Sequence, residues 1–532
     1  MSKYQINTLN FSYNYFDSYL KLRDGIKLIS RIWVPDGQGP WPALLMRQPY
    51  GRQIASSLTY AHPTWWTSKG YLVIIQDVRG QGESEGVFQG FSQEARDTSD
   101  THEWVRSLDL CDGGLGLYGF SYQGITQLTG EDNSLPPDCL APAMTGLDIQ
   151  NHWASDGNSY WWHNNILWAL QMTALKVKRE KNVNAWNNIR ETIENNTYLS
   201  IGLDLVKKYD SNNFIIKWME IINSQKESER IKPLDSWLKK PMLIFGGLWD
   251  PHLKGAIDLY KQSLDLGGEP EIFIGNATHL EWWQGSQETL LNFFDGHLKN
   301  KHNKKKANER NKKIWNISLE RWDELERENK NKYFFGFEGE GISNVEIKDG
   351  SLVENRKGSG FTILVHDPWR PSPMNGGHLG RNPGMFDRGS IDKRFDIAVF
   401  QTNILEKEIL ISGIPMLETS VISDCESYDI CLALSVVDSE NSSVKQFSTG
   451  FLRVKSKENL KEAVHKIALH PTHITLKKGN KLRISIAGAG WPVIGVNPGS
   501  SDHNCGAPTI NHKVITIKYN LEKTFMKILP FF

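Results

Sequence analysis

The sequence is poor in cysteine and carries no excess of charge of either sign. Its five cysteines are scattered over 532 residues without a C-x-x-C pair. A disulfide framework and a cysteine-based metal or redox site are therefore not expected. Lys plus Arg and Asp plus Glu both number 61, so the chain lacks the basic surplus typical of proteins that bind nucleic acid or a membrane surface.

Long apolar runs are also missing. No stretch approaches the roughly 20 apolar residues of a membrane span, and the polar start Met1–Asn7 has no signal-peptide core. We therefore expect a cytoplasmic protein. The one local charge excess, the lysines and arginines between 301 and 313, is expected to be a solvated linker because no aromatic residues are interleaved with it.

The first part of the chain alternates between strand and helix patterns. Short apolar runs at Leu28–Val34, Ala43–Gln48 and Tyr71–Asp77 predict strands, and Glu94–Leu108 predicts an amphipathic helix before a further strand at Leu115–Gly119. This alternation predicts an α/β fold with a mostly parallel sheet.

Two changes of pattern divide the rest of the chain. A Trp- and Asn-rich segment with helical spacing predicts a helical insertion, after which strands resume at Met242–Gly246 and Glu271–Gly275. Short alternating apolar segments separated by turn residues then dominate the C-terminal part, as in a β-sandwich or jelly roll. The predicted organisation is an α/β core over 1–145 and 236–305, a helical cap insertion over 146–235 and a β domain over 306–532.

Ser121 is the first candidate catalytic residue. It follows the strand that ends at Gly119 and precedes a predicted helix, so its hydroxyl would stand on a sharp strand-to-helix turn. The common signature of such a turn is G-x-S-x-G. Here the second glycine, Gly124, comes one residue late.

A serine nucleophile needs a base, and the base needs an orienting carboxylate. Asp250 follows the strand Met242–Gly246, and His279 follows the strand Glu271–Gly275. Both residues lie where loops leave the carboxyl ends of predicted strands, and the order Ser, Asp, His is the one found in α/β-hydrolases. The joint match of three residues predicts a catalytic triad.

Several further motifs accompany the predicted triad in order along the chain. They are Asp24-Gly25, Arg47-Gln48-Pro49-Tyr50, the run Asp77–Gly86, Gly-x-Ser-Tyr-x-Gly at 119–124, Gly247-Leu248-Trp249-Asp250, Thr278-His279, Gly479–Ile484 and Trp491-Pro492 with Asn497-Pro498-Gly499. With these motifs the chain resembles the cocaine-esterase and X-Pro dipeptidyl-peptidase-like family of α/β-hydrolases over nearly its whole length. The resemblance implies an α/β-hydrolase core with a helical cap and a C-terminal galactose-binding-like jelly roll.

The resemblance also implies roles for individual residues. Tyr50 would contribute its hydroxyl to the oxyanion hole and Tyr122 its backbone N–H, while His279 would take the proton of Ser121 and Asp250 would orient His279. An ester or amide substrate would be cleaved through an acyl-enzyme, and no metal or organic cofactor is needed. From the residues alone, Tyr50 is equally compatible with a core-facing aromatic.

Other candidate residues have weaker support. His252 lies two residues after Asp250 and is an alternative base, but the Ser, Asp, His order would then fail. Trp153, Trp162 and Trp168 in the insertion are candidates for an acyl pocket, although clustered aromatics are as often core.

The family includes esterases and peptidases, and one absence bears on the choice. α-Amino-acid ester hydrolases place acidic residues shortly after the catalytic aspartate to bind the substrate ammonium, whereas this chain has Pro251, His252 and Leu253 there. Asp156 is a lone candidate substitute. We therefore favour a carboxylic-ester or acyl hydrolase acting on a small-molecule ester or amide, with Xaa-Pro dipeptidyl-peptidase-like or β-lactam acylase activity as alternatives.

A further alternative comes from another class of protein. The jelly roll would also suit a non-catalytic carbohydrate-binding or scaffold protein with a decayed core. The intact residues Ser121, Asp250, His279 and Tyr50 argue against decay. The sequence does not set the oligomeric state and is compatible with a homo-oligomer.

Overall fold

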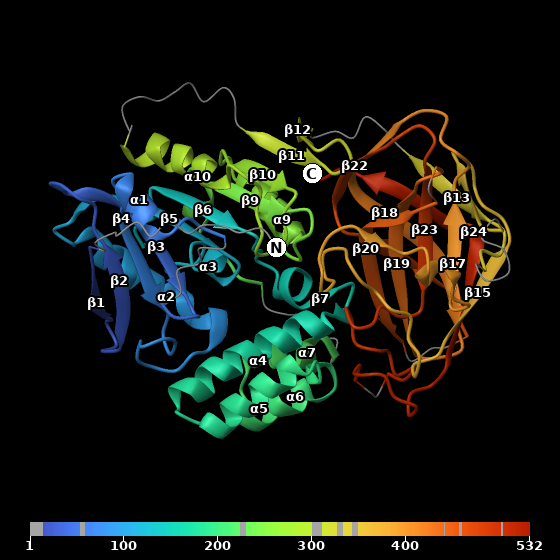
Figure 1. The fold of residues 1–532 in the computed structure, drawn as a ribbon, viewed down its shortest axis with the longest axis horizontal. Coiled ribbons are helices and arrows are strands. Elements are labelled where there is room, and N and C mark those ends of the chain that lie inside the picture. The colour runs from blue at the N-terminus through green and yellow to red at the C-terminus, as the bar shows by residue number, and fades with distance from the viewer. Residues whose placement is uncertain are drawn as a thin grey trace, which may run out of the picture. The chain divides into compact units, whose positions relative to one another are not determined.

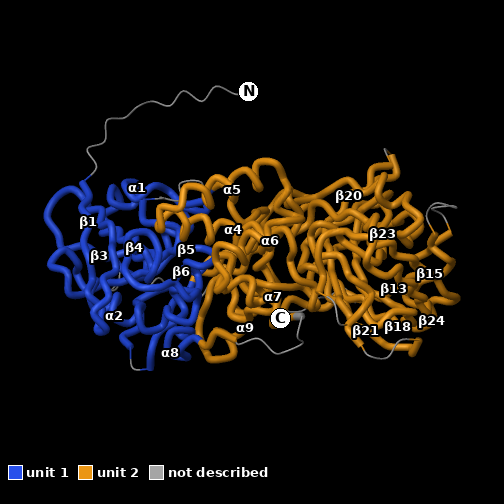
Figure 2. Tube along the Cα trace, turned by 90° about the horizontal axis from the view of Figure 1, so that it is seen from below, with its two compact units in different colours: residues 1–142, 233–242, 285–307 blue, residues 143–232, 243–284, 308–532 orange. Residues whose placement is uncertain are grey.

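The computed structural model divides the chain into two compact units, shown in different colours in Figure 2. Unit 1 consists of residues 1–142, 233–242 and 285–307, and unit 2 of residues 143–232, 243–284 and 308–532. The structure describes residues 14–53, 59–132, 134–223, 230–299, 311–326, 333–342, 349–440, 442–456, 460–501 and 504–532. Of the predicted basic linker, only Lys312 and Lys313 lie within the described residues.

Unit 1 is built on a mixed β-sheet. Its strands are β1 (Tyr15–Lys21), β2 (Lys27–Trp33), β3 (Trp41–Gln48), β4 (Leu72–Asp77), β5 (Cys111–Phe120) and β6 (Cys139–Ala143), in the order β1-β2-β4-β3-β5-β6. β4, β3 and β5 run parallel, and β1 and β2 are antiparallel. Every residue of β4 is buried, which explains why the parallel strands were recognisable as apolar runs.

The helices of unit 1 are mostly short. They are α1 (Pro63–Ser68), α2 (Glu94–Arg106), α3 (Tyr122–Ile125), α8 (Asp235–Leu238) and α10 (Ser286–Phe294), with the single turns η1 (Gly90–Gln93) and η3 (Asp295–Lys299). α2 carries Glu94 and Asp97 in its first turn and Arg106 in its last, the charge order that the helix dipole favours.

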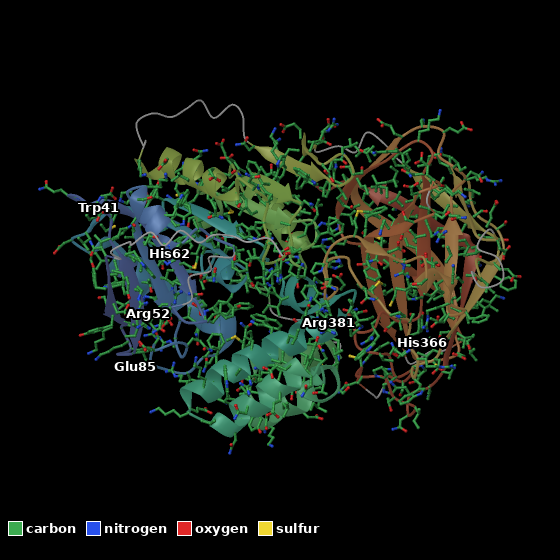
Figure 3. The ribbon with its side chains drawn as sticks, viewed as in Figure 1. Trp41, Arg52, His62, Glu85, His366 and Arg381 are labelled. Atoms are coloured by element: carbon green, nitrogen blue, oxygen red, sulfur yellow. The ribbon has the colours of Figure 1, made fainter. Side chains whose placement is uncertain are left out.

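Ion pairs fix the loops that follow β3 and β4. Arg52, labelled in Figure 3, pairs with the buried Asp77 at 2.8 Å (Nη1 to Oδ2). Arg79 pairs with Asp97 at 2.6 Å. Gly82 has a φ of 55°, and a Cβ at this position would overlap the Asp77 carboxylate, so the backbone path there requires glycine.

The first part of unit 2 is the predicted helical insertion. Its elements are η2 (Gln150–Ala154), the two-residue strands β7 (Ser155–Asp156) and β8 (Ser159–Tyr160), and the helices α4 (Trp162–Arg179), α5 (Val183–Glu194), α6 (Tyr198–Tyr209) and α7 (Phe214–Asn223). α4 packs on α5, α6 and α7, and together the four helices form the bundle visible in Figure 1. No helix of the described residues is long and apolar enough to cross a membrane.

A second group of strands in unit 2 leads into the loops that carry Asp250 and His279. β9 (Leu243–Gly247), β10 (Glu271–Gly275) and β11 (Lys312–Asn316) are parallel, β12 (Arg321–Glu324) is antiparallel to β11, and α9 (Leu253–Asp265) follows β9. The pairing of β11 with β10 continues this sheet past residue 306, where the sequence suggested that the β domain begins. The predicted domain boundaries themselves stay a prediction.

The remainder of unit 2 is all β, as predicted. Its elements are β13 (Phe334–Glu338), β14 (Ser351–Glu354), β15 (Phe361–His366), β16 (Phe386–Asp387), η4 (Ile391–Lys393), β17 (Ile397–Gln401), β18 (Ile409–Ser423), β19 (Ser427–Val437), β20 (Val444–Lys455), β21 (Ala463–Ala468), β22 (Thr472–Leu476), β23 (Lys481–Ala487) and β24 (Ile515–Leu529). The long strands β18 and β24 pair antiparallel, and buried and half-buried residues alternate along β18. This alternation leaves one face of β18 in a core.

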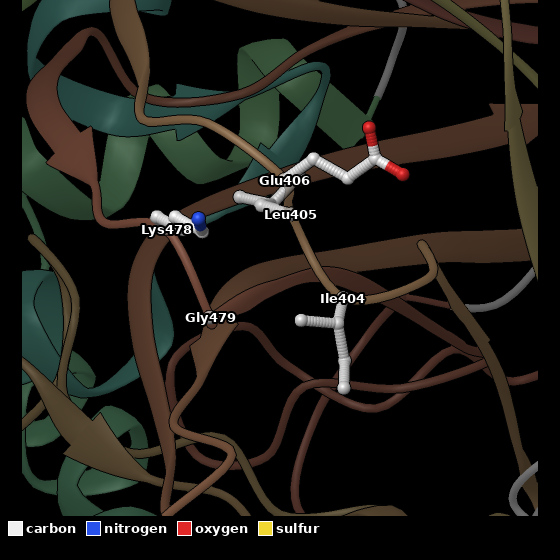
Figure 4. A pocket seen from close by; sticks show the side chains of 5 residues that line it. All are labelled: Ile404, Leu405, Glu406, Lys478 and Gly479. Atoms are coloured by element: carbon white, nitrogen blue, oxygen red, sulfur yellow. The ribbon is translucent and has the colours of Figure 1, made fainter.

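A shallow pocket of about 610 Å³ lies on the surface of the β domain (Figure 4). It is lined by Ile404, Leu405, Glu406, Lys478 and Gly479. These described lining residues include no aromatic side chain, whereas ligand pockets are usually lined by apolar and aromatic groups. The pocket therefore gives no particular support to a carbohydrate-binding function.

Candidate active site

Ser121 stands on a strained turn in unit 1. β5 ends at Phe120, α3 begins at Tyr122, and Ser121 between them has φ 59° and ψ −127°. Such a conformation is costly for a residue with a side chain and is typical of functional turns. Gly119 has a φ of 142°, and a Cβ there would overlap the Cβ of Gln123, which is why glycine precedes the turn.

Side-chain amides hold this turn in place. Gln123 accepts a hydrogen bond from the backbone N–H of Phe120 (3.2 Å), and Gln127 donates to the carbonyl of Gly119 (3.0 Å). The carbonyl of Ser121 accepts from the N–H of Gly124 (2.9 Å). The strand and the helix on either side of Ser121 are thus fixed to each other.

The side chain of Tyr122 is fully buried, and its hydroxyl is hydrogen-bonded inside unit 1. Its hydroxyl lies 2.7 Å from Oε1 of Glu94, and Glu94 in turn pairs with Arg47 at 2.9 Å. Burial raises the pKa of Glu94, an effect that Arg47 partly offsets. What Tyr122 can offer to a substrate is its backbone N–H, for which no described residue is a hydrogen-bond acceptor.

Tyr50 lies in a loop that is joined to the same turn. Gln48 donates to the carbonyl of Gly51 (3.1 Å) and accepts from the side chain of Gln123 (3.3 Å). These two bonds connect the half-buried Tyr50 segment to the first turn of α3. The arrangement is compatible with the predicted role of Tyr50 in an oxyanion hole, which stays a prediction.

Asp250 and His279 lie together in unit 2. Nδ1 of His279 is 2.5 Å from Oδ2 of Asp250, and the backbone N–H of His252 donates to Oδ1 (2.8 Å). Asp250 is fully buried and His279 is partly exposed. Burial alone would raise the pKa of Asp250, but His279 and the His252 N–H hold it below its usual range. The carboxylate is therefore charged and is hydrogen-bonded to the imidazole.

The loops that carry these two residues are tied to each other. β9 and β10 are parallel neighbours, so both loops leave the same edge of the sheet. The N–H of Trp249 donates to the carbonyl of Ala277 (3.0 Å), and its indole N–H donates to Oδ1 of Asn276 (2.6 Å). A Cβ on Gly247 would lie 2.5 Å from the same Ala277 carbonyl, so the close approach of the loops requires glycine there.

His252, the alternative base, plays a different role. Asp250 accepts a hydrogen bond from its backbone, while the His252 ring nitrogen Nδ1 lies 2.6 Å from the carbonyl oxygen of His152. Burial lowers the pKa of His252 to about 4. The residue bonded to Asp250 through a ring nitrogen is His279.

The three insertion tryptophans have different surroundings. Trp153 and Trp162 are buried, and their indole N–H groups donate to the carbonyls of Gly146 (2.7 Å) and Leu199 (3.0 Å). Trp168 is half-buried and stacks on Trp153 at 5.7 Å. Packing accounts for Trp153 and Trp162, and a contribution of any of the three to an acyl pocket stays a prediction.

Asp156, the candidate for binding a substrate ammonium, already has partners. Its carboxylate lies 2.8 Å from Nζ of Lys254 and 2.9 Å from Nε2 of His378. Burial alone would raise the pKa of Asp156, but Lys254 and His378 hold it well below its usual range. The charge of this buried carboxylate is thus matched within the protein.

The structure brings together part of the predicted site. Ser121, Tyr50 and Tyr122 belong to unit 1, and Asp250 and His279 belong to unit 2. The three-residue triad therefore stays a prediction. Among the described residues, no group of three or more His, Cys, Asp or Glu side chains could hold a metal ion.

Two features of the site were missed from the sequence. The buried pair Arg47 and Glu94 anchors Tyr122, and Asp156 is paired with Lys254 and hydrogen-bonded to His378. The only available signal was Arg47 itself, which lies in the Arg-Gln-Pro-Tyr motif. No sequence pattern connects Asp156 with His378, 222 residues away.

Comparison with known proteins covers nearly the whole chain. Residues 24–281 match the family model described as X-Pro dipeptidyl-peptidase (S15 family), and residues 296–521 match the X-Pro dipeptidyl-peptidase C-terminal non-catalytic domain. The cocaine esterase of Rhodococcus sp. (strain MB1 Bresler) is 23% identical over 478 residues, which span 82% of this chain and 83% of the relative.

Solved structures show the same fold. An aminopeptidase from a marine sediment archaeon, Thaumarchaeota archaeon, has a TM-score of 0.71 at 18% identity and covers 99% of both chains. An α-amino acid ester hydrolase has a TM-score of 0.69 at 17% identity and covers 99% of this chain and 98% of its own. A CocE/NonD family hydrolase from Staphylococcus aureus also has a TM-score of 0.69 at 17% identity, covering 96% of this chain and 93% of its own.

Proposed function

Because the chain belongs to the cocaine-esterase and X-Pro dipeptidyl-peptidase-like family of α/β-hydrolases, we propose that it is a serine hydrolase that cleaves carboxylic esters or related acyl bonds. Its named relatives are hydrolases, and hydrolysis is the class of its activity. The observation that carries the proposal is the buried Asp250 carboxylate bonded at 2.5 Å to Nδ1 of His279. This pair leaves Nε2 of the imidazole as the atom that can take a proton.

In the proposed mechanism Ser121 is the nucleophile. Nε2 of His279 takes the proton of the serine hydroxyl as Oγ attacks the substrate carbonyl, and Asp250 stabilises the resulting imidazolium. His279 then gives the proton to the leaving alcohol or amine. Water, activated in the same way, resolves the acyl-enzyme and restores Ser121.

The proposed oxyanion hole consists of the Tyr50 hydroxyl and the Tyr122 N–H. Two donors aimed at the developing oxyanion lower the barrier, and one such donor contributes about 2.7–4 kcal/mol in comparable hydrolases. The buried anchoring of the Tyr122 side chain supports this role, because it fixes the peptide unit whose N–H would donate.

The proposed substrate carries no free ammonium group that must be recognised. A buried ammonium requires a carboxylate partner, and three buried or partly buried carboxylates of the insertion and α9 already have partners. Asp156 is bound by Lys254 and His378, and Asp148 and Asp258 both pair with Arg230. This pairing favours an ester or acyl hydrolase over an aminopeptidase.

Labelling with a fluorophosphonate tests the nucleophile. We expect a covalent adduct on Ser121 in the folded wild-type protein and none in Ser121→Ala. Ser99→Ala removes another buried hydroxyl, one that donates within α2 to the carbonyl of Ala95, and serves as the matched control that should still be labelled. An unlabelled wild type would refute the serine mechanism and favour the non-catalytic alternative.

A substrate screen tests the proposed substrate class. We expect p-nitrophenyl acetate and butyrate to be hydrolysed with a higher kcat/KM than Gly-Pro and Ala-Pro anilides. Faster turnover of the anilides would reverse the order and assign the protein to the dipeptidyl-peptidase branch.

A further inference from the structure

His252 sits between the catalytic pair of unit 2 and the helical insertion. It is the residue before α9. Its backbone N–H donates a hydrogen bond to Oδ1 of Asp250, while Nδ1 of His279 is bonded to Oδ2. Each carboxylate oxygen therefore has its own donor. This arrangement fixes the rotation of the Asp250 side chain about its last bond.

The imidazole of His252 is held in one tautomer. A carbonyl oxygen only accepts hydrogen bonds, so Nδ1, which lies 2.6 Å from the carbonyl oxygen of His152, carries the proton. The ring is buried, with 6% of the residue exposed. A buried histidine without a charged partner on its ring remains neutral.

The same ring packs directly against His279. The two ring centroids are 5.1 Å apart and the planes are tilted by 51°. Trp153 lies 4.3 Å from the His252 ring and Trp161 lies 5.9 Å from it. His252 thus fills the space between the imidazole of His279 and the indoles of the insertion.

The backbone on the insertion side is in close contact with α9. A Cβ on Gly255, in the first turn of α9, would lie 2.6 Å from the Cα of Gly146. The carbonyl of Gly146 also accepts the indole N–H of Trp153. The segment 146–153 and the start of α9 therefore form one packed block, and His252 is the side chain through which this block contacts His279.

From this geometry we propose that His252 is a positioning residue: its neutral ring confines the imidazole of His279 to the orientation in which it serves as the base. The inference rests on the proposed serine-hydrolase function. The titratable groups that surround the His252 ring are Asp250, His279 and His152. A neutral ring at this place adds no second positive charge beside the imidazolium that forms on His279 during the reaction.

Two substitutions separate the ring from its hydrogen bond. His252→Asn keeps a side-chain N–H that can donate to the His152 carbonyl but removes the ring, and His252→Phe keeps a neutral ring but removes the donor. Misplacement of a catalytic group by about 1 Å costs roughly 100-fold in rate. We expect His252→Asn to lower kcat for p-nitrophenyl acetate by about 10- to 100-fold with KM changed less than about twofold, and to slow fluorophosphonate labelling by the same factor.

The phenylalanine variant should show the opposite pattern. We expect His252→Phe to keep kcat within about threefold of the wild type, because the ring that confines His279 is present. Its Tm should fall by a few degrees, because the buried His152 carbonyl loses its donor. If His252 had a merely structural role, the variant with the larger loss of Tm would also show the larger loss of kcat.

His163 provides a matched control. It is another buried histidine of unit 2, and its Nε2 lies 2.8 Å from the carbonyl of Leu379. His163→Asn should leave the ratio of kcat to KM and the labelling rate unchanged. A loss of kcat in His163→Asn as large as that in His252→Asn, or a wild-type kcat in His252→Asn, would overturn the positioning role while leaving the hydrolase function intact. A wild type that is neither labelled nor active on esters would instead refute the proposed function and the inference with it.

Discussion

Replacing Asp250 by asparagine changes one atom of the proposed catalytic pair and makes one of its two hydrogen-bond acceptors a donor. Both carboxylate oxygens now accept, one from His279 Nδ1 at 2.5 Å and one from the backbone N–H of His252 at 2.8 Å. An asparagine offers one acceptor and one donor. If its oxygen keeps the backbone N–H, its NH₂ faces Nδ1, and the proton of His279 must move to Nε2.

The magnitude follows from this change of tautomer. With Nε2 protonated, the imidazole no longer accepts the serine proton, and the same exchange in serine proteases lowers the rate about 10⁴-fold. We therefore expect kcat/KM of Asp250→Asn for p-nitrophenyl acetate to fall by about four orders of magnitude, which corresponds to about 5.5 kcal/mol of transition-state stabilisation.

The assay compares Asp250→Asn with Asp258→Asn at one pH. Asp258 lies on α9, is partly exposed and pairs with Arg230 and Gln262, so its amide variant should retain kcat/KM within about threefold. Near-UV circular dichroism would check that both variants are folded. An Asp250→Asn protein that keeps more than about a tenth of the wild-type kcat/KM would refute the assignment of Asp250 as the orienting carboxylate.

The other predictions concern the oxyanion hole, the serine turn and acid stability. Tyr50→Phe should lower kcat by about 100- to 1000-fold with little change in KM, the effect of losing one oxyanion donor, and steady-state kinetics would contradict the role if kcat stayed within threefold. Gly119→Ala should lower Tm or abolish folding, because the new Cβ would overlap Gln123 at a φ of 142°; a Tm equal to that of the wild type would show that the turn relaxes. Burial lowers the pKa of His102 to about 3 and of His252 to about 4 from 6.5. The unfolded chain therefore binds protons below pH 6.5 that these buried rings do not bind, so the free energy of unfolding is highest above pH 6.5 and falls as the pH falls toward 4, by about 3 kcal/mol for each histidine. Thermal unfolding between pH 7 and pH 4 measures this loss, and a constant Tm over that range would contradict it.

The parts of the fold with local signals were predictable. β10 was predicted with its observed bounds, Glu271–Gly275, because a short buried apolar run ends there in glycine. β1 was not predicted, because most of its residues are exposed and show no apolar alternation. For the C-terminal part the sequence predicted a series of short strands but not which strands pair, such as β19 with β20.

The candidate site also has a part that local sequence signals predict and a part that they do not. That Asp250 and His279 would lie side by side follows from their places at the ends of strands in an α/β sheet, where parallel neighbours carry their loops to one edge. The contacts of Asp156 with Lys254 and His378 could not be predicted, since these residues are 98 and 222 residues away from it. Such contacts depend on the packing of three separate segments, for which a single sequence holds no local pattern.

The paired state of Asp156 also bears on how substrate preference can evolve in this chain. A carboxylate that is to receive a substrate ammonium must first lose its resident donors, and here these are the Lys254 ammonium on α9 and the His378 imidazole in the β domain. Loss of Lys254 would leave the buried carboxylate without its positive partner, a state that typically costs about 3–5 kcal/mol. Loss of His378 would leave one carboxylate oxygen without its donor. We expect a change from ester to amino-terminal substrates to require coordinated substitutions in distant segments, with intermediates that fold less well than either end point.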